Sequence, residues 1–354
     1  MNPHSVERRL EIHRSLIGDN SDAYIIAEIG HNHQGKLDIA MEMFRTAKDC
    51  GADAVKLQKR DNKTLFTKAA YNAAYHSENA YAPTYGAHRE ALEFGHAEFL
   101  ALRDYAKELG VDFIATAFDM PSADFLAEVG ITAIKIASGD IINTPLLKYV
   151  ASLGKPMIMS TGGVQLEDVQ RAYDAVRPLN SQFCILQCTS VYPAEPEHMN
   201  LRVINTFRKL FPDIVIGLSD HQNGIAMAVA AYTLGARVFE KHFTLNRAWK
   251  GTDHAFSLEP VGLRKLVRDL KRCREALGDG IKYPMAVEKG PFTKMSKKIV
   301  AGRDLPEGTV LTMQDLAFKC PGDGLPPYEV DRLLGKRLAT SLTEDDPLSF
   351  DDVE

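Results

Sequence analysis

The stretch from Val238 to Phe256, VFEKHFTLNRAWKGTDHAF, decides the fold that we expect for this chain. It begins as an apolar run and then breaks into a polar segment, which is typical of a buried strand that ends in a functional loop. Side chains alternate along a strand, so Glu240 and His242 share one face and Lys241 takes the other. A matching run upstream, residues 214–221, also ends in a histidine. Two strands that each deliver a histidine at the carboxyl end indicate a shared metal site at one mouth of a barrel.

The chain alternates short β-rich runs with helical patterns from residue 24 onward, such as the apolar stripe of residues 37–47. Eight such alternations within about 250 residues predict an α/β fold, a (β/α)8 TIM barrel, whose active site lies at the carboxyl ends of the strands. A doubly wound open sheet is the alternative, but no Gly-x-Gly-x-x-Gly motif follows the first strand. The predicted strands are residues 24–30, 53–58, 112–118, 133–138, 156–161, 183–189, 215–220 and 238–243.

A second domain is predicted at the carboxyl-terminal end of the chain. After a helical pattern at 261–277, Gly and Pro residues mark a linker, and the remainder shows short β runs, tight turns and a short helix near 328–334. About 58 residues are enough for a small core. We therefore expect the barrel over residues 1–282, a linker over 283–296 and a small domain over 297–354.

The connection between the second and third strands, Lys59 to Gly95, is longer than an ordinary barrel loop. Structureless loops of this length are usually lids or binding loops, and Thr84 to Arg89 is the part that could reach over the mouth. An excursion over the surface without ligand contact would explain the length equally well.

Composition and charge limit the function classes. The net charge is −5 and no long basic run is present, which disfavours nucleic acid as a partner. No apolar run approaches the roughly 20 residues that span a bilayer, and the start of the chain lacks the apolar core of a signal peptide. We expect a soluble, cytoplasmic protein without a membrane partner. Its five cysteines are expected to be reduced thiols, with Cys184 and Cys188 as small apolar filler on one strand.

Inward-facing polar groups are predicted at the ends of the strands. Lys56 and Lys135 lie on different strands with several hydroxyl groups nearby, and this combination suits a phosphate, which needs positive charge and many donors. The alternative is that one lysine pairs structurally with Glu240 or Asp140. The other inward-facing groups are Glu28, Gln58, Thr116, Ser138, Ser160, Thr161, Gln187, Thr189, Ser190, Tyr192 and Ser219.

His221 and His242 are the candidate metal ligands. A single histidine of this kind is usually a core imidazole bonded to backbone. Two at equivalent strand ends, with Glu28 and Glu240 available, favour a shared cation instead. Imidazole with water or carboxylate suits Mn2+, Co2+, Zn2+ or Mg2+.

These residues belong to motifs that resemble those of the sialic acid synthases (N-acylneuraminate synthases, including the animal enzymes that form the 9-phosphate). The tail from Lys297 resembles the antifreeze-like (SAF) domain that follows the barrel in that family, so the resemblance covers nearly the whole chain. The matching motifs are Ala27–Gly35 (AEIGHNHQG), Gly51–Asp53 with Lys56 and Gln58, Lys135 with Ser138–Asp140, Gln187–Pro193 (QCTSVYP), Gly217–His221 (GLSDH) and Trp249–His254 (WKGTDH).

The resemblance implies a transferase that condenses phosphoenolpyruvate (PEP) with an N-acylated mannosamine or its 6-phosphate, with Mn2+ favoured over Mg2+ or Co2+ as the cofactor. The catalytic residues that we predict are Glu28, His221, His242, Glu240 and Asp140, with His221 and His242 as the metal ligands. The implied PEP contacts are Lys56, Thr116, Lys135, Ser138, Ser160, Ser190 and Ser219. The implied sugar contacts are Gln58, Tyr192 and Asp253.

The same resemblance implies a domain-swapped homodimer, because in this family the small domain covers the partner's barrel mouth. Bacterial synthases that use the unphosphorylated sugar carry Lys-Arg-Pro in the tail, and that arginine contacts the sugar. Here the tail reads Lys319-Cys320-Pro321, which favours the animal-like subgroup and a sugar 6-phosphate.

Two other hypotheses belong to different classes of protein. A metal-dependent pyruvate aldolase on the same barrel would not need the second lysine and the hydroxyl cluster. A non-enzymatic carbohydrate- or ice-binding protein built on the tail would leave His221, His242 and Glu28 without a role.

In the reaction that the resemblance implies, C3 of PEP attacks the sugar aldehyde, a metal offsets the charge on the aldehyde oxygen, and water adds to C2 before phosphate leaves.

Overall fold

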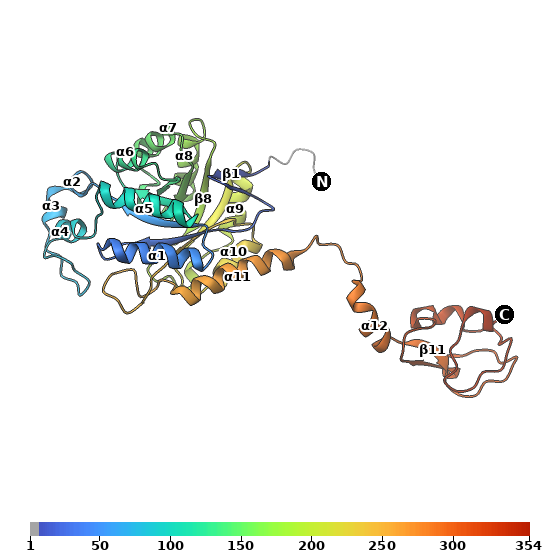
Figure 1. Cartoon of the computed structure of the whole chain (residues 1–354). Helices are drawn as coiled ribbons and strands as arrows, with labels where there is room; N and C mark the ends of the chain where they lie inside the picture. The colour runs from blue at the N-terminus through green and yellow to red at the C-terminus, as the bar shows by residue number, and fades with distance from the viewer. Residues whose placement is uncertain (1–6) are drawn as a thin grey trace. The chain divides into compact units, whose positions relative to one another are not determined.

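The computed structural model describes residues 7–354, and the first six residues of the amino-terminal stretch considered above lie outside it. The described chain forms two compact units that divide after Gly278 (Figure 1). The larger unit is a closed barrel of parallel strands surrounded by helices, and the smaller one contains a two-stranded sheet. The predicted TIM barrel with a small carboxyl-terminal domain is therefore confirmed.

Eight strands close the barrel in the order β10-β3-β4-β5-β6-β7-β8-β9. Each pairs with its neighbour in parallel, so their carboxyl ends meet at one mouth. All eight lie where the sequence predicts them, with ends that differ by at most two residues. Their bounds are β3 Tyr24–Gly30, β4 Ala54–Lys59, β5 Asp112–Ala117, β6 Ala133–Ile136, β7 Met157–Ser160, β8 Phe183–Cys188, β9 Val215–Asp220 and β10 Val238–His242.

Helices cover the outside of the barrel. In the first, the predicted apolar stripe of Ala40, Met43, Phe44 and Ala47 is buried against the sheet. The long helices of this unit are α1 Leu37–Asp49, α5 His96–Leu109, α6 Met120–Val129, α7 Thr144–Ser152, α8 Leu166–Val176, α9 Val203–Leu210, α10 Ala226–Thr233 and α11 Pro260–Leu277. Short 3-10 helices follow β6 and β8, at Ser138–Asp140 and Pro196–His198.

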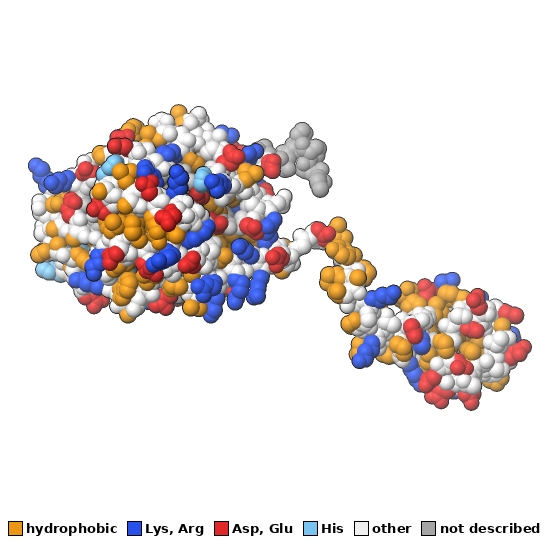
Figure 2. Space-filling view, viewed as in Figure 1, with side chains coloured by type: hydrophobic (Ala, Val, Ile, Leu, Met, Phe, Trp, Pro, Cys, Tyr) orange, Lys and Arg blue, Asp and Glu red, His pale blue; other side chains and the backbone are white. Residues whose placement is uncertain are grey.

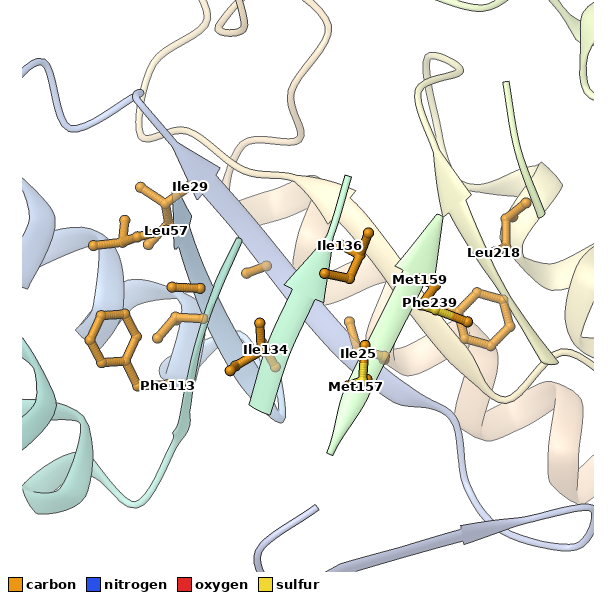
Figure 3. Packing of buried hydrophobic residues seen from close by; sticks show 14 of the residues in the cluster. Ile25, Ile29, Leu57, Phe113, Ile134, Ile136, Met157, Met159, Leu218 and Phe239 are labelled. Carbon is orange, nitrogen blue, oxygen red and sulfur yellow. The ribbon is translucent and has the colours of Figure 1, made fainter. Parts of the chain in front are cut away.

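The main core lies between the strands and these helices. Every second strand residue points outward into it, as Figure 3 shows for Ile25, Leu57, Ile134, Met157 and Phe239. The opposite face of each strand therefore points into the barrel and is free to carry other chemistry.

A β-hairpin that the sequence analysis did not predict fills the amino-terminal end of the barrel interior. Strands β1 (Arg9–Ile12) and β2 (Ser15–Gly18) pair antiparallel and bury Leu10, Ile12 and Ile17. These side chains form one apolar cluster with the lower inward-facing residues of the strands, Tyr24, Ile26, Ala54, Ile114, Ala133, Ile158, Cys184, Leu186, Val215 and Val238. The apolar filling confines polar side chains inside the barrel to the carboxyl-terminal mouth.

The long connection after β4 is not structureless. It folds into three short helices, α2 Asn62–Leu65, α3 Lys68–Asn72 and α4 Tyr85–Glu90. The segment Thr84–Arg89, which the sequence analysis singled out, forms the N-cap and most of α4, where the Thr84 side chain accepts a hydrogen bond from the backbone of Ala87.

The smaller unit, Asp279–Glu354, has its own apolar core around Ile299, Leu305 and Leu333. Strands β11 (Lys298–Ala301) and β12 (Leu316–Lys319) pair antiparallel, and 3-10 helices lie at Met313–Asp315, Pro327–Arg332 and Phe350–Asp352. The predicted linker contains the 3-10 helix Ala286–Glu288 and helix α12 (Lys289–Met295).

The surface of the barrel unit mixes charges of both signs on the face that Figure 2 shows, in keeping with the small net charge. Across residues 7–354 no helix has both the length and the apolar character that crossing a membrane requires.

Candidate active site

A cavity of about 400 Å3 opens at the mouth of the barrel. It is lined by every predicted site residue except Asp140, namely Glu28, Lys56, Gln58, Thr116, Lys135, Ser138, Ser160, Ser190, Tyr192, Ser219, His221, Glu240, His242 and Asp253. Strand alternation brings most of these side chains together, because they lie on the inward face toward the carboxyl ends of their strands. Ser138, Ser190, Tyr192 and Asp253 come from the segments that follow β6, β8 and β10.

Four buried charges form the floor of this cavity. Lys56 Nζ lies 2.8 Å from a carboxylate oxygen of Glu28 and 3.8 Å from Glu240, and it donates a hydrogen bond to Thr116 Oγ1 at 2.8 Å. Lys135 Nζ donates to the backbone carbonyl of the next residue at 2.7 Å. The two lysines and two glutamates cancel in charge, so an anionic ligand would need a further cation beside it.

The pKa values of the two glutamates are shifted in opposite directions. Burial raises the pKa of Glu28 despite the nearby Lys56, and the carboxylate of Glu240 adds to the rise. Burial acts on Glu240 in the same sense, but Lys135 and Lys56 outweigh it and lower the pKa of Glu240. Burial also lowers the pKa of Lys135. Carboxyl groups with pKa values displaced in opposite directions suit different roles in acid–base chemistry.

One wall of the cavity is a cradle of hydroxyl groups around Gly162. Its backbone N–H donates to Ser138 Oγ at 2.9 Å, and a Cβ at this position would lie 2.1 Å from Ser190 Oγ. The Ser160 hydroxyl is buried and has no hydrogen-bond partner within residues 7–354. A small anion with several acceptor oxygens fits this wall, since it can accept from the free Ser160 hydroxyl, while glycine at position 162 leaves room for the Ser190 hydroxyl beside it.

His221 and His242 face each other, with ring centroids 5.4 Å apart. The Nδ1 atom of His221 lies 2.8 Å from the carbonyl of Thr189 and donates to it, which leaves Nε2 with its lone pair. The Nδ1 atom of His242 is buried without a hydrogen-bond partner in the described chain, 3.8 Å from the carboxylate of Asp253. Burial lowers the pKa of His242 to about 3, so this imidazole is neutral and able to act as a ligand.

This pair fits a metal ion in spacing and chemistry. Two imidazoles bound at about 2.1 Å to one ion place their ring centroids roughly 4.5–5.5 Å apart, which matches the observed separation. Among residues 7–354 no group of three or more His, Cys, Asp and Glu side chains is arranged to hold a metal. The chain therefore offers two nitrogen donors, and the other ligands of an ion here would be water or substrate.

Asp140, the remaining predicted catalytic residue, does not line the cavity. It ends the 3-10 helix after β6, and burial raises its pKa to about 6. Lys135 and Ser138 are three residues apart, so a continuous strand would place them on opposite faces. Both reach the cavity because β6 ends at Ile136 and Ser138 lies in that helix.

Three residues predicted to face inward lie elsewhere. The side chains of Thr161, Gln187 and Thr189 donate to backbone carbonyls and are absent from the cavity lining. The inward positions of β8 are instead those of Cys184 and Cys188, and Cys188 lines the cavity 3.5 Å from Ser138 Oγ. Cys188 is therefore part of the site wall as well as a core residue.

The sequence analysis missed two arginines of the cavity wall. Arg60 follows β4 and continues the inward alternation of Lys56 and Gln58, so that pattern could have identified it. Arg89 comes from the end of α4, and its position depends on how the long connection folds. The connection between strands two and three therefore does contribute to the cavity.

A larger groove of about 900 Å3 lies at the opposite end of the strands, beside Asp53, Asp112 and Thr132. It contains neither the histidine pair nor the buried lysines. Because the polar interior of the barrel opens at the other mouth, the cavity around His221 and His242 is the candidate active site.

Family models match both units of the chain. The NeuB family model matches residues 43–282, and the SAF domain model matches residues 298–354.

Named relatives match over most of their length. The N-acetylneuraminate-9-phosphate synthase of Homo sapiens is 44% identical over 94% of this chain and 93% of its own. The N,N'-diacetyllegionaminic acid synthase of Legionella pneumophila is 36% identical over 95% and 96%, respectively. A crystal structure of the N-acetylneuraminic acid (sialic acid) synthetase of Leptospira borgpetersenii, in complex with citrate, has a TM-score of 0.72 at 33% identity and covers 81% of this chain and 96% of that one.

Proposed function

The chain belongs to the NeuB family, and from this premise we propose that it is a nonulosonate (sialic acid) synthase that condenses PEP with an N-acylated mannosamine, free or 6-phosphorylated. The relatives' names include both a 9-phosphate and an unphosphorylated product, so they do not decide between the two forms of the sugar. The observation that carries the proposal is the single cavity in which paired histidines face buried lysines and a free hydroxyl.

PEP is the substrate that best matches the lysine and serine side of the cavity. Its phosphate and carboxylate need cations and many donors, which Lys56, Lys135 and the hydroxyls beside Gly162 supply. The unpartnered Ser160 hydroxyl gains an acceptor when an anion occupies this wall. Because Glu28 and Glu240 neutralise the lysines, the proposal also requires a divalent cation at the histidines.

His221 and His242 would hold that cation, with Mn2+ favoured over Mg2+ or Co2+. When bound, it would supply a Lewis acid that offsets the negative charge developing on the aldehyde oxygen. Tyr192 packs against the ring of His221 and Phe256 against that of His242, with centroids 4.2 and 4.8 Å apart. Asp253 lies 3.8 Å from His242 and Gln58 bonds to Glu28, and both would orient the sugar.

The proposed reaction forms one carbon–carbon bond, consumes one water and releases phosphate. The C2=C3 electrons of PEP attack the sugar aldehyde carbon, so a carbon–carbon bond forms and C2 becomes electron-deficient. Water adds to C2, and Glu28, whose raised pKa suits proton transfer, carries the water proton toward the alkoxide formed from the aldehyde. The tetrahedral carbon then collapses to a ketone: its bond to the phosphate oxygen breaks, and the remaining hydroxyl proton passes to the departing phosphate. Glu240 stays ionised and holds Lys56 and Lys135 in place for the departing phosphate.

We propose that the active form is a homodimer in which the tail domain of one chain covers the barrel mouth of the other. Support comes from the first part of the smaller unit, residues 281–295, where Figure 2 shows apolar side chains gathered at the surface. The exposed members are Ile281, Tyr283, Met285, Val287, Phe292 and Met295. An exposed apolar patch of this kind is usually covered by another surface.

The test is phosphate release from PEP, measured with a panel of N-acylmannosamines, each free and 6-phosphorylated, with and without divalent metal. We expect release only when sugar and metal are both present, and loss of release in the H221A/H242A double variant. Pyruvate in place of PEP tests the aldolase hypothesis, and we expect no product from it. Undiminished release in the double variant, or product from pyruvate, would refute the proposal.

A further inference from the structure

Arg60 and Arg89 form a second cationic region of the cavity wall that the chemistry of PEP does not use. Arg60 follows β4 and Arg89 lies in the last turn of α4, and both line the cavity. The two guanidinium groups meet at one imidazole, that of His31.

The contacts to His31 leave this cluster with more donors than acceptors. Arg60 Nη1 lies 3.2 Å from Nε2 of His31, and Arg89 Nη1 lies 3.3 Å from Nδ1 of the same ring. A neutral imidazole accepts at one nitrogen and carries a proton on the other. One of the two arginines therefore points an N–H at another N–H, whichever tautomer His31 adopts. Burial, Arg60 and Arg89 all lower the pKa of His31, so protonation does not relieve the conflict.

The charges around this cluster do not cancel as they do on the cavity floor. Glu93 lies within 4 Å of Lys59 and Arg60 and neutralises one of them. Arg89 forms no ion pair in the described part of the chain and donates instead to the hydroxyl of Tyr85 at 2.9 Å. Glu28 and Asp253 are further carboxylates near this cluster, but neither forms an ion pair with Arg89, so the charge of Arg89 has no counter-ion within residues 7–354. An anionic ligand would restore the balance and supply the missing acceptors.

Arg60 is held rigidly enough to receive such a ligand. Its side chain is 8% exposed, its Cζ lies 3.9 Å from the ring centre of Phe118, and its Nη2 donates to Gln58 Oε1 at 2.6 Å. A buried, stacked and partly bonded guanidinium loses little entropy when it binds a phosphate, and its fork geometry suits two phosphate oxygens.

The distance from the reacting groups fits the far end of a hexose. Gln58 bridges the two regions, because its amide donates to Glu28 at 2.7 Å while its oxygen accepts from Arg60. One glutamine side chain and two hydrogen bonds thus separate the arginine from Glu28. An open-chain sugar with its aldehyde near Glu28 and the histidines extends its sixth carbon over a comparable length.

We propose that Arg60 and Arg89, bridged by His31, form a subsite for the terminal phosphate of the sugar, so that the substrate is an N-acylmannosamine 6-phosphate. This inference rests on the proposed function and names the substrate class of that same cavity. The product would then carry its phosphate at the end of the chain opposite the new carbon–carbon bond.

The experiment compares kcat/KM for N-acetylmannosamine 6-phosphate and for N-acetylmannosamine, each with saturating PEP and Mn2+. Wild type should prefer the phosphorylated sugar. The R89Q and R60Q variants should each lower that preference about 10- to 100-fold, the usual effect of losing one charged hydrogen bond to a phosphate. K63Q is the matched control, because Lys63 is an exposed cation of the same long connection, in α2, that does not line the cavity; its preference should stay within about threefold of wild type.

Titration calorimetry with the sugar 6-phosphate, in the absence of PEP, separates the two proposals and does not depend on turnover. We expect binding that weakens in R89Q and is partly retained in R89K, where the charge remains. Arg89 is half-buried and carries the test if R60Q does not fold. Phosphate release with both sugars at equal kcat/KM, or an unchanged preference in R89Q, overturns the subsite and leaves the synthase proposal standing. Tight binding of the sugar 6-phosphate without release of phosphate from PEP supports the subsite and overturns the synthase.

Discussion

At the scale of single residues, Glu28 and Glu240 show how position decides chemistry. Both are buried carboxyl groups inside the barrel, and both lie within 4 Å of Lys56. Lys135 and Lys56 lower the pKa of Glu240, while burial dominates at Glu28 and raises its pKa. Neighbouring strands therefore provide one carboxyl group able to exchange a proton and another that anchors cations.

His33 provides a prediction about stability and pH. Its ring stacks on Phe94, its Nδ1 accepts from the backbone of Gly35 at 3.1 Å, and burial lowers its pKa to about 3. In the unfolded chain His33 binds a proton with the ordinary histidine pKa of about 6.5. The stability that neutral His33 provides is therefore complete above that pH and is lost as the pH falls toward 3. In H33N nothing titrates at this position, so the contribution of His33 to the pH dependence of stability should disappear.

The measurement is urea unfolding of wild type and H33N at about pH 7, 6 and 5. The difference in unfolding free energy should shrink by about 1.4 kcal/mol per pH unit below about 6.5. Other titrating groups, including Asp53 and Asp140 with pKa values raised to about 6, are common to both proteins and cancel in the difference. Parallel pH profiles would contradict the prediction.

The residues that the sequence identified are those that strand alternation controls. Lys56 and Glu28 could be predicted because a barrel interior follows a period of two from each strand. Gln187 was assigned to the wrong face because β8, FCILQC, is buried on both sides and gives no contrast between faces. Arg89 could not be predicted from a strand pattern, since the fold of the long connection brings it to the cavity.

At the scale of elements, the turn after β7 sets the shape of the hydroxyl cradle. A Cβ on Gly162 would lie 2.1 Å from Ser190 Oγ and 3.0 Å from Ser138 Oγ, so a G162A substitution must push both hydroxyls aside. We expect the KM for PEP to rise roughly 10- to 100-fold, as for the loss of one or two hydrogen bonds, with a smaller change in kcat.

A double-mutant cycle with S190A provides the control for G162A. S190A removes the hydroxyl that the new methyl group of G162A contacts first. In the S190A background, G162A should therefore raise the KM for PEP less than it does in wild type, so the effects of the two substitutions should not add. Additive effects would show that the cradle is not the cause. Thermal unfolding of each variant checks that the barrel itself is intact.

The amino-terminal hairpin marks the limit of the sequence analysis for elements. Arg9-Leu10-Glu11-Ile12 does alternate polar and apolar residues, but strands of four residues in a charged stretch give a weak signal. What holds β1 and β2 together is the barrel interior beneath them, and this exists only after eight distant strands have closed. The βα units were predictable because each repeats one local pattern.

At the scale of the whole molecule, the two units have separate apolar cores, and the segment that joins them exposes several large apolar side chains. The proposed exchange of tails between two chains predicts that the barrel and the tail of one active site belong to different chains.

Two inactive variants test this exchange of tails. One is the full chain with H221A and H242A, which has a tail but a disabled barrel, and the other ends after Gly278, which has an intact barrel but no tail. We expect each to be inactive alone and their mixture, after mild denaturation and refolding together, to regain activity, because hybrid dimers place the tail of the first over the barrel of the second. Mixing two preparations of the same variant is the matched control. Full activity of the chain that ends after Gly278, or a mixture as inactive as its parts while the full chain runs as a monomer, would contradict the exchange.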